Sequence, residues 1–311
     1  MSRSTPTPEK QDRSRRASNT AIEATKSFQC AEVFGGNRAV DLPISLPGIS
    51  GRVRSIPCQS RVGGDIHYIS TCGSGVMSRF AIADVVGHGA DVESVSSHAH
   101  QLLRQFMNAI DHREALETLN DRLSSWGLDA LTTAAVFTFF PPTRTLSFSY
   151  AGHPPAWFFS RALQRWFRLE LRPPSVHGDL DEINFPLAVS EETLYSVDQI
   201  KVMPGDRLVV ISDGLTDALN ESREIFGSRR VESILNRFAT LDSSELVETL
   251  LTALKEFCGE KRFTHDDVTI IALEFEPITK FDCARLFLRN RLIRPVGAAA
   301  QRAWQFLRGA R

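Results

Sequence analysis

The spacing of apolar residues changes from a helical to a strand pattern in the middle of the chain, and this change most constrains the fold. Apolar residues recur at helical spacing in 91–110 and again in 113–126. The next segments, 132–140 and 145–151, are rich in aromatic and β-branched residues, and a Pro-Pro-Thr turn separates them. They predict two antiparallel strands joined by a short turn. A helix pair followed by a hairpin argues against an alternating βαβ fold.

Further strands and a second helix pair extend this order. We expect strands at 79–86, 156–159, 165–171, 194–202, 207–211 and 268–275, and helices at 228–238 and 243–257. Asp242 followed by Glu245 has the pattern of a capping box in front of the last of these helices. Hairpin strands combined with paired helices predict an α+β fold, a four-layer αββα sandwich of two antiparallel sheets flanked by helix pairs.

Composition separates the two ends of the chain from its middle. Residues 1 to about 27 are rich in Ser, Thr, Pro and Arg, with hardly any large apolar residue, so ordering them would bury little. We therefore expect a disordered tail and lead-in at 1–45, a folded domain at 46–277 and a basic C-terminal extension at 278–311. Residues 1–27 carry six Lys/Arg against three Asp/Glu, and 278–311 carry eight against one, which leaves −11 for the middle. An acidic middle disfavours nucleic acid as a partner.

Hydrophobicity and cysteine usage predict a cytoplasmic protein with reduced thiols. No stretch approaches the roughly 20 apolar residues that cross a bilayer, and the N-terminus lacks the apolar core of a signal peptide. The five cysteines are odd in number and scattered, and none lies in a C-x-x-C pair. This pattern argues against both a zinc site and a disulfide scaffold.

Aspartates stand where predicted strands end or turn. They are Asp65, Asp84, Asp213 and the pair Asp266-Asp267, each with glycine or another acid within three residues. Gathered carboxylates repel one another unless cations fill the space between them, and hard oxygen ligands select Mg²⁺ or Mn²⁺. Two such ions roughly 3.5–4 Å apart bridge a water and present hydroxide to a phosphorus centre. A single Asp-Gly pair, taken alone, is more typical of a turn.

Several exact motifs in one order resemble the bacterial branch of the protein phosphatase 2C (PPM-type) family, typified by stage II sporulation protein E and the phosphatases that regulate sigma factors. The resemblance covers residues 60–275. It is carried by Gly63-Gly64-Asp65, Asp84-Val85-x-Gly87-His88-Gly89, Ala151-Gly152-His153-Pro154-Pro155, Pro204-Gly205-Asp206, Ser212-Asp213-Gly214-Leu215-Thr216-Asp217 and Asp266-Asp267-Val268-Thr269.

The resemblance implies a phosphoprotein phosphatase that hydrolyses phosphoserine or phosphothreonine on a partner protein, such as an antagonist of an anti-sigma factor. Attack by a water bridging two Mn²⁺ or Mg²⁺ ions would do the chemistry without a phosphoenzyme. The implied metal ligands are the side chains of Asp65, Asp84, Asp213 and Asp266, and the backbone carbonyl of Val85. Asp266 matches the fourth side-chain ligand better than Asp267. The family usually shows an aromatic pair and another aspartate after Gly63-Gly64-Asp65, whereas this chain continues Ile66-His67-Tyr68-Ile69.

Histidines and the helices after Gly89 have less certain roles. His88 is a candidate general acid that protonates the departing serine oxygen, and the equally weighted alternative is that its imidazole fixes the loop. His153 and Asp206 are interpreted as structural, and His98 and His100 as solvated or packed on a helix. The resemblance also implies regulation and homodimer contacts through the helices after Gly89.

Rival chemistries lack their motifs. Six residues separate Cys72 from Arg79, whereas a cysteine phosphatase needs five, and neither a G-x-S-x-G elbow nor a P-loop occurs. The serious alternative is a catalytically silent domain of the same fold that binds a phosphoprotein or another partner. A scaffold, however, has no need to keep mutually repelling carboxylates together.

The C-terminal extension lies beyond the last family motif. Drawn as a helix, it places Phe281, Ala284, Leu288 and Leu292 on one stripe, flanked by arginines. This pattern suggests a weak contact with an anionic membrane surface or a protein. Leu286 and Ile293 lie off the stripe, and the alternative that the segment folds back on the acidic domain or stays free is weighted more heavily.

Overall fold

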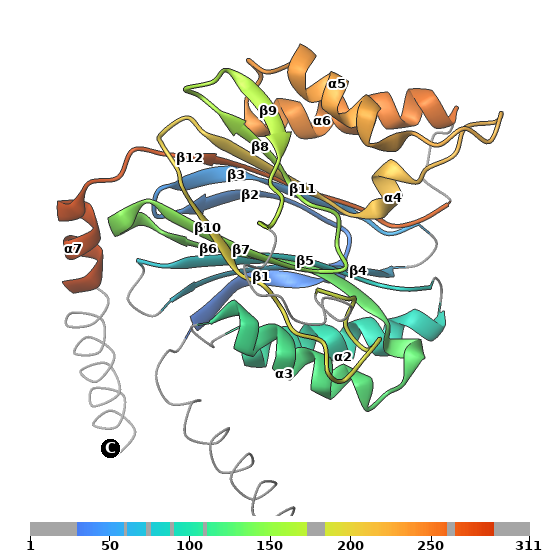
Figure 1. Cartoon of the computed structure of the whole chain (residues 1–311). Coiled ribbons are helices and arrows are strands. Elements are labelled where there is room, and N and C mark those ends of the chain that lie inside the picture. The colour runs from blue at the N-terminus through green and yellow to red at the C-terminus, as the bar shows by residue number, and fades with distance from the viewer. Residues whose placement is uncertain are drawn as a thin grey trace, which may run out of the picture.

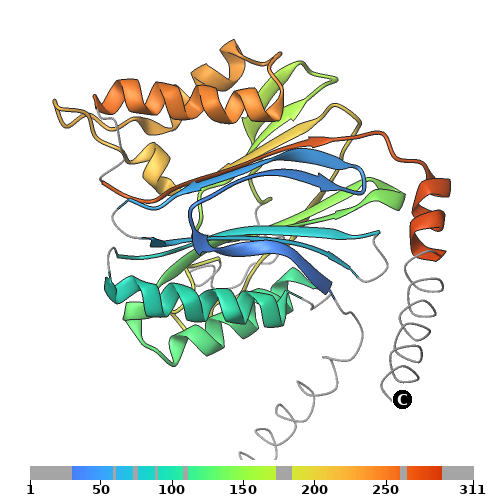
Figure 2. The same ribbon diagram turned by 180° about the vertical axis from the view of Figure 1, so that it is seen from behind.

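Two six-stranded antiparallel sheets stack on each other, and helices cover both outer faces (Figures 1 and 2). The computed structural model describes residues 30–58, 61–72, 76–87, 90–107, 111–172, 184–259 and 265–288. Sheet A has the order β1 (Cys30–Arg38), β4 (Val62–Cys72), β5 (Ser78–Val85), β6 (Thr132–Phe140), β7 (Thr145–Ala151) and β10 (Asp198–Lys201). Sheet B has the order β2 (Val40–Leu46), β3 (Ile49–Ile56), β12 (Val268–Phe275), β11 (Arg207–Ile211), β8 (Trp157–Ser160) and β9 (Arg165–Arg168).

One helix pair covers each sheet. Sheet A packs against α2 (Ala90–Phe106) and α3 (His112–Ser124), and sheet B packs against α5 (Gly227–Arg237) and α6 (Ser243–Cys258). Shorter elements are α4 (Asp213–Thr216), α7 (Lys280–Leu288), η1 (Leu128–Ala130) and η2 (Pro141–Thr143). The order of layers is therefore αββα, which confirms the predicted four-layer sandwich.

Three apolar layers hold the sandwich together, because each strand points alternate side chains to opposite faces of its sheet. The layer between the sheets is rich in phenylalanine, and Phe80 stacks on Phe137 with ring centroids 5.1 Å apart. The second layer, between sheet A and its helices, includes Leu103, Leu116 and Val136. The third lies between sheet B and its helices. Burial of apolar surface at about 25 cal/mol per Å² makes these layers the main source of stability.

The predicted hairpin and helix pairs are present, and the N-terminal boundary is corrected. β6 and β7 match the predicted strands, and both helix pairs lie within a few residues of their predicted ends. The expectation of a disordered lead-in up to residue 45 was wrong for residues 30–45, because β1 and β2 form there. β1 gains its backbone hydrogen bonds from β4, and β2 gains them from β3. The rest of the predicted tail, 1–29, lies outside the described residues.

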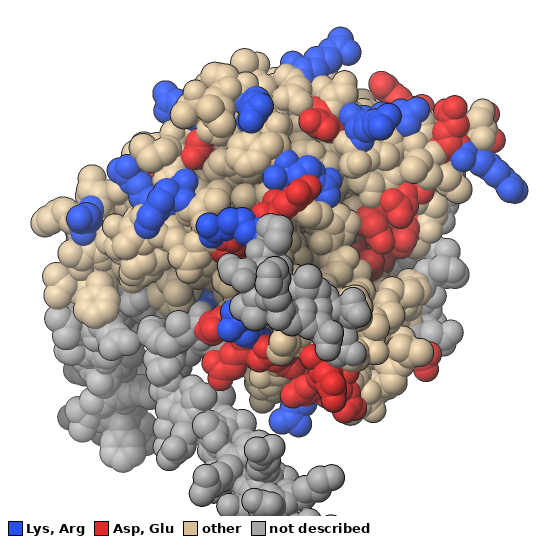
Figure 3. All heavy atoms as spheres, viewed as in Figure 1, with Lys and Arg blue, Asp and Glu red and all other residues tan. Residues whose placement is uncertain are grey.

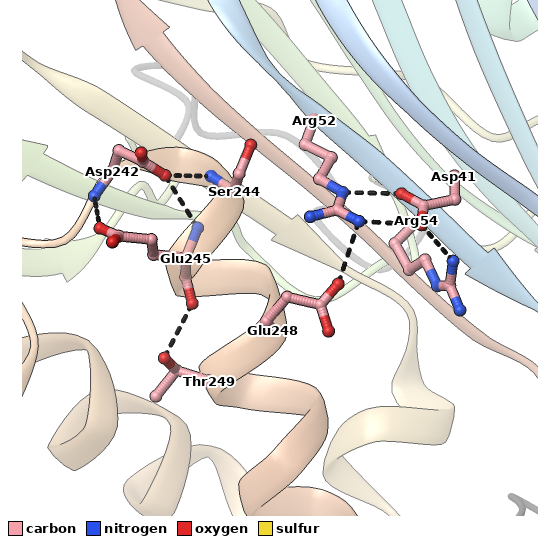
Figure 4. A network of polar contacts seen from close by, with 8 residues as sticks. All are labelled: Asp41, Arg52, Arg54, Asp242, Ser244, Glu245, Glu248 and Thr249. Atoms are coloured by element: carbon pink, nitrogen blue, oxygen red, sulfur yellow. Dashed lines mark hydrogen bonds and ion pairs between the residues drawn. The ribbon is translucent and has the colours of Figure 1, made fainter.

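The start of α6 is fixed by local and distant contacts (Figure 4). The Asp242 carboxylate accepts from the backbone N–H groups of Ser244 and Glu245, both at 2.8 Å, and the Glu245 side chain accepts from Asp242 N at 3.1 Å. This confirms the predicted capping box. Arg52 on β3 bonds Asp41 on β2 at 2.7 Å and Glu248 on α6 at 3.0 Å. The helix is thereby tied to the edge of sheet B.

The described start of the C-terminal extension is helical, as predicted. In α7 Phe281, Ala284 and Leu288 face solvent, whereas Cys283 is buried against the domain. Leu292 and the remainder of the extension lie outside the described residues. Within the described ranges, no helix combines the length and apolarity that a membrane crossing requires.

Candidate metal centre

Asp65 and Asp84 lie opposite each other where β4 begins and β5 ends, as register partners of the antiparallel pair. Like charges in directly opposed positions of a sheet destabilise it. Asp65 is only 2 % exposed, and burial raises its pKa to about 8, with further contributions from Asp267 and Asp213. Burial, followed by the charge of Asp65, also raises the pKa of Asp84 well above its usual range. Two carboxylates held in this way are candidate ligands for a cation.

Asp213 and Asp266 reach the same place from sheet B. β11 and β12 are antiparallel, so the residues just after Ile211 lie beside those just before Val268. Asp213 is the first residue of α4. Burial raises the pKa of the Asp213 carboxyl, and Asp266 is the largest charge that adds to this rise. We call the place where these four aspartates meet the aspartate edge; it lies beside α4 in Figure 1.

Gly64 leaves room for a close approach of backbone and carboxylate. A Cβ at this position would lie 2.7 Å from the carbonyl oxygen of Val85 and 3.4 Å from Asp84 Oδ1. Any side chain would therefore collide with the carbonyl that the sequence predicts as a metal ligand. The absence of a side chain at Gly64 thus leaves the Val85 carbonyl and Asp84 Oδ1 close to the start of β4.

Asp267 has a different function from its neighbour Asp266. Its carboxylate accepts backbone hydrogen bonds from Cys58 at 2.7 Å, from Gly64 at 2.5 Å and from Asp65 at 3.4 Å. It therefore joins the end of β3 and the start of β4 to the loop before β12. The residue is 7 % exposed. Three backbone N–H groups donate to the carboxylate of Asp267. Asp266 is therefore the better candidate of the two for a metal ligand.

A chain of buried hydroxyl groups supports Asp65 from sheet B. Ser212 Oγ donates to Asp65 Oδ2 at 2.7 Å and accepts from Thr269 N at 2.9 Å. Thr269 Oγ1 in turn donates to Ser55 Oγ at 2.9 Å. All four residues are at most 2 % exposed. Sequence analysis missed this chain, although Ser212 and Thr269 stand in the quoted motifs. The signal was a hydroxyl residue directly before Asp213 and another two positions after Asp267.

His153 and Asp206 have the structural roles that were predicted. His153 is 4 % exposed, its Nδ1–H donates to the Pro154 carbonyl at 2.9 Å, and burial lowers its pKa to about 4. Asp206 accepts from the N–H groups of Met203 at 2.7 Å and Arg161 at 2.8 Å, which closes the turn between β10 and β11. Neither side chain is a metal ligand in this arrangement.

Two further histidines have packing or hydrogen-bonding contacts. His98 stacks on Trp126 with ring centroids 4.3 Å apart, so it is packed on the helix as predicted. His265 was not singled out by the sequence; its Nε2–H donates to the Gly214 carbonyl at 2.9 Å, linking the loop of Asp266 to the loop of Asp213. His88 and Gly89, the predicted general acid and its flanking glycine, lie outside the described residues.

The donor set suits hard divalent cations. It consists of carboxylate oxygens and one backbone carbonyl, the ligands that Mg²⁺ and Mn²⁺ prefer over nitrogen and sulfur. In the described part of the chain, no three acidic, histidine or cysteine side chains close around a single point. An open arrangement suits Mg²⁺, which binds through one or two carboxylates and keeps several waters. Burial and the neighbouring carboxylates raise the pKa values of Asp65, Asp84 and Asp213, and a bound cation would offset both effects.

Known proteins of similar sequence and fold include phosphatases. Protein IcfG of Synechocystis is 26% identical over 178 residues, which cover 56% of this chain and 24% of that protein. Phosphoserine phosphatase RsbU of Bacillus subtilis is 22% identical over 224 residues, covering 70% and 61%. The chain thus spans less than two thirds of the length of both relatives. The fold resembles that of RsbX, solved in complex with magnesium, with a TM-score of 0.54, 16% identity and coverage of 76% and 100%.

The family assignment rests on a longer match. The family model of stage II sporulation protein E (SpoIIE) matches residues 76–276, which include Asp84, Asp213 and Asp266 of the aspartate edge. This match extends over more than half of the chain. The protein therefore belongs to the stage II sporulation protein E family.

Proposed function

We propose that this chain is a metal-dependent phosphatase that removes phosphate from serine or threonine of a partner protein. The observation that carries the proposal is the aspartate edge, where burial and mutual repulsion raise the pKa values of Asp65, Asp84 and Asp213, with Asp266 among the neighbouring charges. Such repulsion lowers the stability of the fold unless cations offset it. The family membership and the phosphoserine phosphatase activity named for RsbU support the same reaction class.

The proposed ligands of two Mn²⁺ or Mg²⁺ ions are the side chains of Asp65, Asp84, Asp213 and Asp266 and the carbonyl of Val85. When bound, such ions supply Lewis acidity at phosphorus and lower the pKa of water enough to give a nucleophile at neutral pH. Asp267 and Ser212 position these ligands through the contacts described above. Because water is the nucleophile in this scheme, no side chain forms a phosphorylated intermediate.

Several finer assignments belong to this proposal. His88 would protonate the leaving serine oxygen, and the substrate would be a small phosphoprotein of a sigma-factor pathway in the cytoplasm. A homodimer through α2 and α3 also stays a prediction. A groove of about 340 Å³ between these helices, lined in part by Leu102, Phe106 and Trp126, supports it. Sedimentation equilibrium tests this proposal. The wild type should be a dimer, and Trp126→Ser should be a monomer.

The competing function is a silent domain of the same fold that binds a partner without turnover. The decisive experiment measures phosphate release from a phosphoserine peptide by metal-free protein, before and after addition of Mn²⁺ or Mg²⁺. We expect no release without metal and restored release with it. Asp84→Asn and Asp213→Asn should remove most of the metal-dependent rate, because each deletes the charge of a proposed ligand.

A matched control distinguishes the loss of a proposed metal ligand from the loss of one negative charge elsewhere in the domain. Asp129→Asn removes one carboxylate from η1, where the side chain is exposed, and should keep the wild-type rate. Full activity in excess chelator would refute the metal-dependent mechanism. A wild-type protein that binds Mn²⁺ but releases no phosphate from any phosphoprotein offered would instead favour the silent domain.

A further inference from the structure

The edge of the sandwich opposite the aspartates forms one continuous surface of turns. We call it the turn edge: the β2–β3, β6–β7, β8–β9 and β10–β11 turns together with α7. Val202 N donates to the Arg144 carbonyl at 2.9 Å, and Arg161 Nη1 donates to the Pro204 carbonyl at 3.3 Å. Glu276 N donates to the Gly48 carbonyl at 2.9 Å, which joins the segment before α7 to the β2–β3 turn. These contacts hold the turns and the base of α7 together.

Large apolar side chains project from the turn edge. In α7 the predicted stripe of Phe281, Ala284 and Leu288 points to solvent, and the helix contacts the domain through Cys283. The tips of the neighbouring turns add further exposed apolar residues. The exposed fractions are 37 % for Phe140, 59 % for Leu163, 52 % for Met203, 75 % for Phe281, 43 % for Phe287 and 50 % for Leu288.

Cationic side chains lie among these apolar tips. Viewed as in Figure 1, Lys and Arg are spread over the upper half of the molecule, several of them on the α7 side, whereas Asp and Glu gather beside α4 and at the base (Figure 3). Two acids of the turn edge accept hydrogen bonds from hydroxyl groups: Asp282 accepts from Thr279 Oγ1 at 2.6 Å, and Glu276 accepts from Ser50 Oγ at 2.6 Å. After Leu288 the sequence adds six arginines and no acid. The exposed basic residues of the described turn edge are Arg144, Arg161, Arg165, Lys201, Lys280 and Arg285.

We propose that the turn edge docks on an anionic lipid surface. Lysine and arginine bind the negatively charged headgroups, while apolar side chains at the tips of turns and on an exposed helix face enter the interface between headgroups and acyl chains. A nucleic acid would be held by the cations alone and would leave the apolar tips without a partner. A lipid surface uses both kinds of side chain.

An anionic surface repels the acidic middle of the chain, but the distance between the turn edge and the aspartate edge weakens this repulsion. The eight residues of β5 run from the turn edge to the aspartate edge, a span of about 25 Å at roughly 3.3 Å per residue. The Debye length at physiological ionic strength is about 8 Å, so lipid charge is screened at the aspartates. α7 and α4 lie at opposite ends of the sandwich, and docking would therefore leave the proposed active site facing the aqueous side (Figure 1).

The first test changes charge. Full-length protein is sedimented at about 0.1 M salt, where the Debye length is about 10 Å, with vesicles of phosphatidylcholine, with or without phosphatidylglycerol. We expect binding only to the anionic vesicles, and a roughly tenfold or greater fall in the partition coefficient for Arg161→Glu/Arg165→Glu. The matched control, Arg122→Glu/Arg229→Glu, makes the same change in net charge at exposed positions on α3 and α5 and should bind as the wild type does.

The second test removes apolar surface without changing charge. Leu163→Ser/Phe281→Ser should weaken vesicle binding several-fold, whereas the control Leu128→Ser/Leu194→Ser replaces two exposed leucines elsewhere and should not. Circular dichroism and phosphate release check that every variant is folded. The proposal is overturned if the wild type stays in the supernatant, or if the control pairs lose as much binding as the turn-edge pairs. It is also overturned if the wild type is a dimer that Leu163→Ser/Phe281→Ser converts to monomer, since the turn edge would then bind a second copy.

Discussion

Ser212 Oγ donates a hydrogen bond of 2.7 Å to Asp65 Oδ2 across the interface between the two sheets. Ser212 is fully buried and Asp65 nearly so, and the same hydroxyl accepts from Thr269 N. A residue of sheet B thus fixes the orientation of a carboxylate of sheet A. The relative position of the two sheets and the geometry of the proposed metal site are set by the same contact.

Ser212→Ala should therefore affect both stability and metal activation. Removing the hydroxyl leaves Asp65 Oδ2 and Thr269 N without this partner, and we expect the free energy of unfolding to fall by about 1–3 kcal/mol. The Mn²⁺ concentration for half-maximal phosphate release should rise. Ser149→Ala is the matched control, because Ser149 Oγ is a buried donor to the Ser196 carbonyl at 2.6 Å, away from the aspartate edge. It should lose comparable stability with an unchanged metal requirement; a shifted requirement in both variants would contradict the positioning role.

Cysteine chemistry should contribute nothing to turnover. Burial, followed by the nearby charges of Asp267 and Asp266, raises the pKa of the Cys58 thiol to about 11. A thiol in this state is a poor nucleophile near neutral pH. We expect iodoacetamide to alkylate Cys58 slowly at about pH 7.5 in metal-free protein. Mass spectrometry of samples taken over time measures this rate. Replacement of all five cysteines by serine should leave kcat within a few-fold. A stoichiometric phosphocysteine adduct in the wild type would show this expectation to be wrong.

His112 should make the fold sensitive to acid. Its Nε2 lies 2.5 Å from Thr138 Oγ1, which also accepts from Arg79 Nε at 3.1 Å. Burial, with a smaller contribution from Arg79, lowers the pKa of His112 to about 3. Between this value and the ordinary pKa of about 6.5, the unfolded chain binds the proton that the folded chain excludes. The stabilising contribution is therefore complete above pH 6.5 and is lost as the pH falls.

Urea unfolding at a series of pH values measures this effect. The free energy of unfolding of the wild type should decline below pH 6.5, with a contribution from His112 of up to about 1.4 kcal/mol per pH unit. His112→Gln should show a shallower decline over the same interval and a constant difference from the wild type above pH 7. Parallel profiles for the two proteins between pH 4 and 6.5 would contradict the assignment.

Sequence predicted the parts of the fold that are determined by neighbouring residues. The β6–β7 hairpin and the α6 capping box depend on contacts within a few residues, so their patterns can be read directly. β1–β4 were not predicted. β1 pairs with β4, and β3 pairs with β12 on its other side, so these pairings depend on distant segments. β2 and β3 also form a local hairpin, which the sequence patterns did not reveal. β3 pairs with β12, whose Thr269 lies 214 residues after Ser55. The four proposed side-chain ligands were found through the motifs, whereas Ser212 acquires its function only when the sheets meet.

The choice between Asp266 and Asp267 shows the same dependence on distant contacts. In the sequence they are adjacent acids in front of one strand. In the structure, Asp267 accepts from Gly64 N, 203 residues away, and so becomes part of the framework. Asp266 Oδ1 accepts from the N–H of its neighbour Asp267 at 2.8 Å. The difference leads to a paired substitution experiment.

Asp266→Asn and Asp267→Asn should have opposite effects: the first should abolish the response to metal, and the second should lower the stability of the fold. Asp266→Asn keeps an acceptor for the Asp267 N–H and removes one repelling charge, so the metal-free protein should be at least as stable as the wild type. Its response to Mn²⁺ should be lost, both in phosphate release and in the rise of Tm on metal addition. Asp267→Asn turns an acceptor oxygen into an NH₂ group facing the backbone donors of Cys58 or Gly64. The resulting unpaired buried groups should lower the free energy of unfolding by about 1–3 kcal/mol, with a residual metal response. If Asp267→Asn instead kept full stability and lost the metal response, Asp267 would be the ligand and Asp266 its support.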